Sequence, residues 1–313
     1  TVLPPSGLAA LACALSAFLK SGDHILVTDS VYRPTRRFCD EVLQRMNIET
    51  TYYDPSLGSD INSLIKDNTK LIFLEAPGSQ TFEMQDIPAI VSVARDKDIW
   101  TVMDNTWASP LYFKPFEFGI DVSVQAATKY IIGHSDAMLG SITTNERAFE
   151  LVDQNFMNFG LCPGPEDAYL GLRGIRTMPV RLQRHWESGV KIASWLRDHP
   201  DVSRVLHPAL ETDPGHSIWK RDFHGASGLF SIVMNGGSEA ATRAFLDHLN
   251  LFAMGFSWGG YESLAIPFDP TSYRTAVPWS AEGTAFRLHI GLDEPDDLIA
   301  DLDSALYAWK HES

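Results

Sequence analysis

Short apolar runs alternate with helix-length amphipathic stretches through the first half of this chain. Strands are expected at residues 24–29, 49–54, 70–76, 98–104, 121–128 and 138–143, with helices at residues 9–20, 34–46, 61–66 and 87–97. Several of the strand runs, such as residues 70–76 (KLIFLEA), are apolar nearly throughout. Runs of this kind are typical of strands buried on both faces of a parallel sheet. The pattern therefore predicts a doubly wound α/β domain.

The pattern changes near residue 175. Residues 160–174 (GLCPGPEDAYLGLRG) are rich in Gly and Pro, which punctuate secondary structure. A long helix is expected at residues 177–199, followed by a smaller α+β unit. That unit has strands at residues 228–234 and 285–290, a helix at 238–250, a Gly-rich loop at 258–260 and a terminal helix from Pro295. We predict two domains, residues 1–175 and 176–313.

Charge and cysteine content exclude several classes of protein. The 313 residues carry 25 Lys plus Arg against 40 Asp plus Glu, and the net charge of −15 disfavours nucleic acid and membrane surfaces as partners. No apolar run approaches the roughly 18 residues that span a bilayer, and no signal peptide is visible. Three widely spaced cysteines and ten histidines without ligand spacing predict a cytoplasmic protein without disulfides or a metal site.

Two charged residues stand at predicted strand ends, where ligands bind in open α/β sheets. Asp104 ends the run DIWTVMD, and Lys129 follows the run DVSVQAAT. A Lys held in a partly desolvated site has a lowered pKa and becomes a usable nucleophile and base. Taken singly, a capping Asp and a Lys that extends to solvent explain these positions as well.

Two further features suit a flat, anionic ligand. Tyr32 follows the first strand and could stack on a planar group, although a lone aromatic more often serves packing. The segment Ser6-Gly7-Leu8 precedes a predicted helix, whose positive end attracts anions and where a Gly lets the backbone approach. Alone, this segment is equally an ordinary helix cap.

Together these four features describe one ligand, a planar cationic aldehyde that bears a phosphate. Pyridoxal phosphate needs a Lys for its Schiff base and an acidic partner for its pyridinium nitrogen. It also needs an anion site and a flat group against its ring. Because the sequence has one candidate for each requirement, we predict a pyridoxal phosphate enzyme.

Residues 126–136 (AATKYIIGHSD) resemble the Lys-containing signature of the Cys/Met-metabolism pyridoxal phosphate enzymes of fold type I. The resemblance covers essentially the whole chain, through residues 73–79 (FLEAPGS), 104–107 (DNTW) and 287–291 (RLHIG). It implies a large domain of the aspartate aminotransferase type with a mostly parallel sheet, and a smaller C-terminal α+β domain.

The resemblance also implies a cofactor site, made of Gly7, Leu8, Tyr32, Asp104, Thr128 and Lys129. Lys129 would form the Schiff base, Asp104 would hold the pyridinium nitrogen and Tyr32 would stack on the ring, so these three are the catalytic candidates. The backbone N–H groups of residues 7 and 8 and the hydroxyl of Thr128 would bind the phosphate.

For the substrate, the resemblance implies that Arg287 clamps the α-carboxylate with two hydrogen bonds. Residues 257–263 (SWGGYES), including Ser257 and Trp258, would close one wall of the pocket.

Trp258 and residues 76–80 (APGSQ) resemble the bacterial carbon–sulfur β-lyase branch of the family. That branch implies cleavage of L-cystathionine and related cysteine conjugates to homocysteine, pyruvate and ammonia, a step toward methionine. Many γ-acting relatives carry Asn-Pro in this loop and Leu in place of the Trp. Because this is likeness to a branch and not a physical derivation, a γ-acting enzyme stays an alternative.

The family also implies a homotetramer, a dimer of dimers with shared active sites. In the family a Tyr-x-Arg segment that reaches the phosphate of the neighbouring subunit should precede Thr1, so this chain is expected to be a fragment or to have lost that arm. The absence of this segment favours a second alternative, a catalytically silent protein of the same fold. The set of Lys129, Asp104 and Arg287 argues against it.

Overall fold

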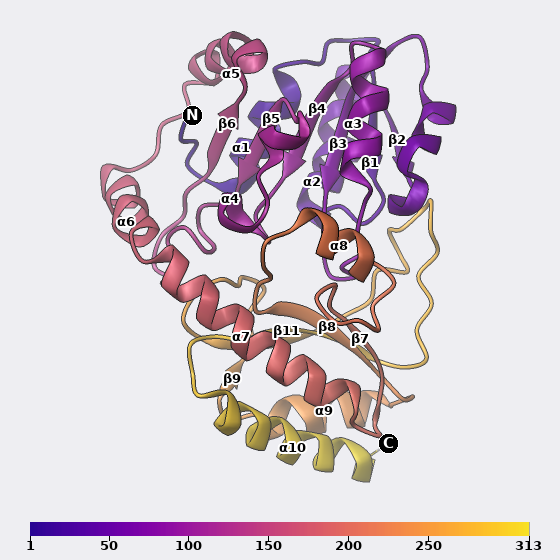
Figure 1. The fold of residues 1–313 in the computed structure, drawn as a ribbon, viewed down its shortest axis with the longest axis vertical. Helices are drawn as coiled ribbons and strands as arrows, with labels where there is room; N and C mark the ends of the chain where they lie inside the picture. Colours follow the sequence, from indigo (N-terminus) through magenta and orange to yellow (C-terminus); the bar gives the residue numbers. More distant parts are fainter. Residues whose placement is uncertain (313) are drawn as a thin grey trace.

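The computed structural model describes residues 1–312, which form two β-sheets stacked along the long axis of the molecule (Figure 1). The first sheet has the strand order β2-β1-β3-β4-β5-β6. Its strands are β1 (His24–Thr28), β2 (Glu49–Tyr53), β3 (Thr69–Glu75), β4 (Trp100–Asp104), β5 (Val122–Gln125) and β6 (Ser141–Thr144). All neighbours pair in parallel except β6, which runs antiparallel to β5. The predicted mostly parallel α/β sheet is confirmed.

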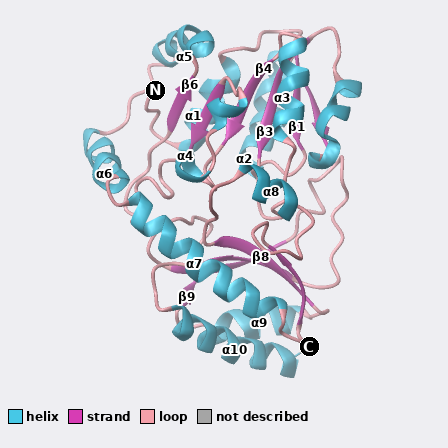
Figure 2. Cartoon of the chain, viewed as in Figure 1, coloured by secondary structure: helices cyan, strands magenta, loops and turns pink. Residues whose placement is uncertain are grey.

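Helices cover both faces of this sheet (Figure 2). The helices of this half are α1 (Gly7–Ser16), α2 (Arg33–Arg37), α3 (Ile87–Asp96), α4 (Ser109–Tyr112), α5 (Glu146–Asn158) and α6 (Pro165–Ile175). Strand β3 shows why the centre of its sequence, residues 71–74, is apolar. Ile72 and Leu74 belong to the apolar cluster on the α3 side, whereas Leu71 and Phe73 belong to the cluster on the α1 side. Burial on both faces explains this apolar run, and Lys70, near the start of the strand, is its one exposed residue.

Two helical predictions in this half were wrong in detail. The expected helix at residues 34–46 is α2 followed by the π-helical η1 (Phe38–Leu43) and the 3₁₀ turn η2 (Gln44–Met46). The expected helix at residues 61–66 is instead the end of η3 (Pro55–Leu64), which consists of 3₁₀ turns interrupted at Gly58.

The Gly/Pro-rich stretch at residues 160–174, for which no helix is predicted, is mostly α6. Pro165 occupies the first helical position, where its missing N–H costs nothing. Gly174 is required by packing, since a Cβ there would lie 2.3 Å from the carbonyl oxygen of Ile131.

The second sheet has the order β7-β8-β11-β10-β9. Its strands are β7 (Val202–Leu206), β8 (Leu229–Met234), β9 (Phe252–Ala253), β10 (Ser263–Phe268) and β11 (Ala285–His289). Its helices are α7 (Met178–Arg197), α8 (His216–Asp222), α9 (Glu239–His248) and α10 (Pro295–Glu312). Helices α7, α9 and α10 cover the face that is turned away from the first sheet (Figure 2).

Successive side chains of β11 point to opposite faces of the second sheet. Phe286 and Leu288 enter the apolar cluster with α9 and α10, so Arg287 and His289 point toward the first sheet. The division of the chain into domains near residue 175 stays a prediction. Within residues 1–312, no helix has both the length and the apolarity needed to cross a membrane.

Candidate active site

A cavity of about 460 Å³ lies between the two sheets, at the carboxyl ends of β3 and β4. All residues of the predicted site line this cavity, namely Gly7, Leu8, Tyr32, Asp104, Thr128, Lys129, Ser257, Trp258 and Arg287. The fold thus brings together residues from six separate segments of the sequence. The roles assigned to them by resemblance stay predictions.

Lys129 follows β5 and reaches the loop that precedes β10. Its Nζ donates a hydrogen bond to Ser257 Oγ at 2.7 Å and lies 5.2 Å from the centre of the Trp258 ring. Burial and the nearby charge of Arg287 lower the Lys129 pKa to about 8, against the opposing effect of Asp104. The loop approaches so closely because Gly259 has φ +85°, and a Cβ there would lie 2.9 Å from the Lys129 backbone. The site therefore holds an amine that loses its proton unusually easily.

Asp104 is the last residue of β4 and is buried. The backbone N–H of Thr106 donates to its Oδ1 at 2.9 Å, and the Thr106 hydroxyl donates to the same oxygen. Burial raises the pKa of Asp104, while the hydrogen bonds from Thr106 and the charge of Lys129 lower it. A carboxylate in such a place is stabilised by any cation that enters the cavity.

Glu75 is a cavity residue that sequence reasoning did not assign to the site. It ends β3 and lies beside Asp104 in the register of the sheet. Its Oε2 accepts a hydrogen bond of 2.8 Å from the backbone N–H of Tyr32. Burial and the adjacent Asp104 raise the Glu75 pKa well above its ordinary value. The signal in the sequence was a Glu at the end of an otherwise apolar strand.

The opposite end of the site is the start of α1. Ser6 caps this helix, since its Oγ accepts from the N–H of Ala9 at 3.1 Å. Helix geometry leaves the N–H groups of Gly7 and Leu8 without intrahelical acceptors, so they are available to an anion. Packing also requires a glycine at position 7, because a Cβ there would lie 2.6 Å from the Ala126 Cβ.

Thr128 lines the cavity, but its hydroxyl is engaged elsewhere. It donates to the carbonyl oxygen of Leu139 at 3.2 Å and accepts from the Leu139 N–H at 3.0 Å. A hydroxyl has one proton to donate, so binding a phosphate through it requires that the bond to the Leu139 carbonyl break.

Arg287 lies in the middle of β11, and its side chain is directed into the cavity. Its Nη2 donates to the carbonyl oxygens of Gly255, Phe256 and Ser257 at 3.0–3.2 Å. Its buried Nε has no hydrogen-bond partner within residues 1–312. Burial lowers its pKa to about 10. A buried guanidinium with an unused donor is suited to bind a carboxylate.

These groups fit pyridoxal phosphate. The amine of Lys129 suits its aldehyde, the buried carboxyl of Asp104 suits its protonated ring nitrogen, and the start of α1 suits its phosphate. The unpartnered Nε of Arg287 is left for a further anionic group.

Comparisons with known proteins agree with this fit. The family model for Cys/Met metabolism PLP-dependent enzymes matches residues 1–307. The chain is 49% identical over 312 residues to a putative cystathionine beta-lyase of Rhizobium johnstonii, covering 98% of this chain and 78% of that protein. It is 47% identical over 311 residues to cystathionine beta-lyase MetC of Escherichia coli, covering 97% and 78%.

Among solved structures, the crystal structure of cystathionine gamma synthase from Xanthomonas oryzae pv. oryzae in complex with aminoacrylate and cysteine is similar, with a TM-score of 0.92. The two chains are 31% identical, and the match covers 100% of this chain and 82% of that one. The relatives named as β-lyases are thus more similar in sequence than this γ-synthase.

Proposed function

The chain belongs to the Cys/Met metabolism PLP-dependent enzymes, and on that premise we propose that it is a carbon–sulfur β-lyase that cleaves L-cystathionine and related cysteine conjugates. The observation that carries the proposal is the cavity itself, in which Lys129, Asp104 and Arg287 converge from distant parts of the chain. The choice of β over γ chemistry is supported by the relatives at 47–49% identity that are named β-lyases.

When bound, pyridoxal phosphate withdraws electrons from the substrate and makes its Cα–H acidic. Arg287 binds the α-carboxylate and orients the substrate. Lys129 takes the Cα proton onto its Nζ, which its lowered pKa makes available as a base. Asp104 holds a proton at the ring nitrogen. The Cβ–S bond breaks with its electron pair going to sulfur, and Lys129 Nζ returns the proton to this thiolate, so that homocysteine leaves. One water converts the remaining three-carbon unit to pyruvate and ammonia.

Product identification tests this function. The protein, loaded with pyridoxal phosphate, is incubated with L-cystathionine, and the products are analysed by mass spectrometry. We expect homocysteine, pyruvate and ammonia in equal amounts. The structural similarity to a γ-synthase supports a γ-acting enzyme as the alternative. Such an enzyme gives cysteine and 2-oxobutyrate by elimination. No product of either kind would support a catalytically silent protein.

The lowered pKa of Lys129 predicts how pH affects cofactor loading. Only the unprotonated amine attacks an aldehyde, and with a pKa of about 8 roughly a tenth of the amine is free at pH 7. We expect the rate of cofactor attachment to rise with pH and to level off above about pH 8–9. Stopped-flow absorbance on the cofactor-free protein measures this rate. A rate that still rises steeply at pH 10 would show that the Lys129 pKa is not lowered.

The role of Arg287 predicts a change in substrate binding. In Arg287→Lys the charge remains but the forked pair of donors is lost, so we expect KM for cystathionine to rise about 10- to 100-fold. Arg184→Lys is the matched control, because Arg184 is on the surface and pairs with Glu294 at 3.0 Å. Steady-state kinetics measure KM for both variants. An unchanged KM in Arg287→Lys would show that Arg287 does not bind the substrate α-carboxylate.

We also propose a homotetramer, built as a dimer of dimers with shared active sites. Large apolar side chains that are exposed along α5 and α6 support an interface there, among them Met157, Phe159, Tyr169 and Leu172. Exposed apolar patches of this kind mark protein–protein contacts. Sedimentation velocity should give a species of four chains, and a monomer at micromolar concentration would contradict the proposal.

A further inference from the structure

The connection between β10 and β11, residues 269–284, leaves the second sheet and reaches the first (Figure 1). We call it the β10–β11 loop. Its contacts fall on two segments of the N-terminal half: the residues that follow β1, and residues 77–83 after β3, which we call the pocket loop. These contacts join parts of the chain that are about 190–250 residues apart.

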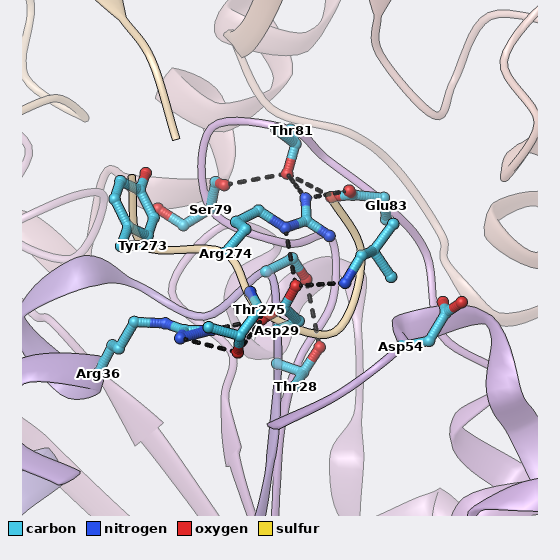
Figure 3. A network of polar contacts seen from close by, with 12 residues as sticks. Thr28, Asp29, Arg36, Asp54, Ser79, Thr81, Glu83, Tyr273, Arg274 and Thr275 are labelled. Atoms are coloured by element: carbon cyan, nitrogen blue, oxygen red, sulfur yellow. Dashed lines mark hydrogen bonds and ion pairs between the residues drawn. The ribbon is translucent and has the colours of Figure 1, made fainter. Parts of the chain in front are cut away.

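Asp29 is the centre of these contacts (Figure 3). It follows β1, and its side chain is completely buried. Arg274 Nε lies 3.1 Å from its Oδ2, and Arg36 pairs with its Oδ1. The backbone N–H groups of Thr275 and Val277 donate to it at 3.0 and 2.9 Å. Burial alone would raise the Asp29 pKa, but these donors together lower it, so the carboxylate stays charged and fixes the β10–β11 loop.

From this anchor, two neighbouring side chains reach the pocket loop. The Nη1 of Arg274 donates to the Thr81 hydroxyl at 3.2 Å and pairs with the Glu83 carboxylate. The hydroxyl of Tyr273 donates to Gln80 Oε1 at 2.7 Å. Arg274 is almost fully buried, with 2% of its side chain exposed. Buried charged pairs of this kind define one geometry, because any other arrangement leaves a charge without a partner.

The pocket loop forms part of the cavity wall. Gly78, Ser79, Gln80 and Phe82 line the cavity. Gln80 and Phe82 have φ of +65° and +57°, a region that residues other than Gly rarely adopt. Such conformations persist only where the surrounding contacts impose them. The contacts of Tyr273 and Arg274 fall on Gln80, Thr81 and Glu83, at and around these strained positions.

We propose that Tyr273 and Arg274 are positioning residues for the substrate, which act by holding the pocket loop in its binding conformation. The inference rests on the proposed lyase activity for the identity of the substrate. Neither residue lines the cavity, and neither has a hydrogen bond or ion pair with Lys129, Asp104 or Arg287 within residues 1–312. Their loss should therefore weaken substrate binding while cofactor attachment and the chemical step remain.

Two variants and a control test this inference. Tyr273→Phe removes one hydroxyl and leaves the ring, and we expect KM for cystathionine to rise about three- to tenfold. In Arg274→Met we expect a rise of about tenfold or more. In both, kcat and the visible absorbance of the bound cofactor should stay within about twofold of wild type. Backbone amides of the pocket loop should exchange hydrogen faster, as measured by mass spectrometry.

Arg204→Met is the matched control. Arg204 holds the other end of the β10–β11 loop through Glu282 at 3.0 Å and the Ser280 carbonyl at 2.9 Å, but it does not contact the pocket loop. We expect its KM and the exchange of the pocket loop to match wild type.

The outcomes separate this inference from the proposed function. If wild type cleaves cystathionine and Tyr273→Phe changes neither KM nor pocket-loop exchange, the positioning role is wrong. If Arg274→Met does not fold, the KM and the pocket-loop exchange of Tyr273→Phe alone test the positioning role. If wild type does not cleave cystathionine, the lyase function fails, while faster exchange in Tyr273→Phe but not in Arg204→Met still supports the anchoring. Equal effects in all three variants would indicate general loosening and overturn the inference.

Discussion

Replacing Lys129 with Ala is expected to reduce the formation of pyruvate from cystathionine by about 10⁴-fold or more. The substitution removes both the amine that attaches the cofactor and the base that takes the Cα proton. Lys129 is the candidate for both roles because its pKa is lowered to about 8 and its Nζ lies 2.7 Å from Ser257 Oγ inside the cavity. Pyruvate release and the visible spectrum of the loaded protein measure the two losses.

Lys114→Ala is the control for this experiment. Lys114 is exposed and lies 3.7 Å from Glu117 on the surface, so its loss should change neither readout. Wild-type rates of pyruvate formation in Lys129→Ala would contradict the proposed chemistry, whatever the spectrum shows.

Asp104→Asn is the second variant with a large expected effect. The amide has nearly the shape of the carboxyl but no charge, so the ring nitrogen of the cofactor loses its ionic partner. We expect kcat to fall about 10²- to 10³-fold, the range for loss of one preorganised electrostatic contact. The bond from the Thr106 N–H at 2.9 Å can persist to the amide oxygen, so the cofactor should still bind. Steady-state kinetics and the visible spectrum measure the two effects.

Asp121→Asn is the matched control, because Asp121 is also a buried carboxylate and lies directly before β5 of the first sheet. Its Oδ2 accepts from the Thr101 N–H at 3.0 Å, and it does not line the cavity. This substitution should lower the melting temperature and leave kcat unchanged. If Asp104→Asn behaves in the same way, the Asp104 charge has no part in the reaction.

The convergence of Asp104 and Lys129 on one cavity could be predicted because parallel strands place their carboxyl ends at one edge of a sheet. Asp104 ends β4 and Lys129 follows β5, so the prediction of parallel strands placed both residues at that edge. Glu75 needed more information, since its place beside Asp104 depends on the register between β3 and β4. The sequence pattern of a single strand does not predict its register with a neighbouring strand.

The second half was harder to predict for a related reason. Strand β10 includes Pro267, which has no N–H and makes the run look unlike a strand, and it was missed. Strand β7 and helix α8 were also missed. The contacts of Arg274 join positions about 190 and 245 residues apart, and no local pattern reveals a partner at that distance.

Identification of the residue that carries the cofactor tests the assignment of the active site. The protein loaded with pyridoxal phosphate is reduced with borohydride, digested and analysed by mass spectrometry. We expect the reduced cofactor on Lys129 alone, in the peptide that contains residues 126–136. A modified Lys elsewhere, or an unmodified Lys129 in protein that cleaves cystathionine, would show that this cavity is not the active site.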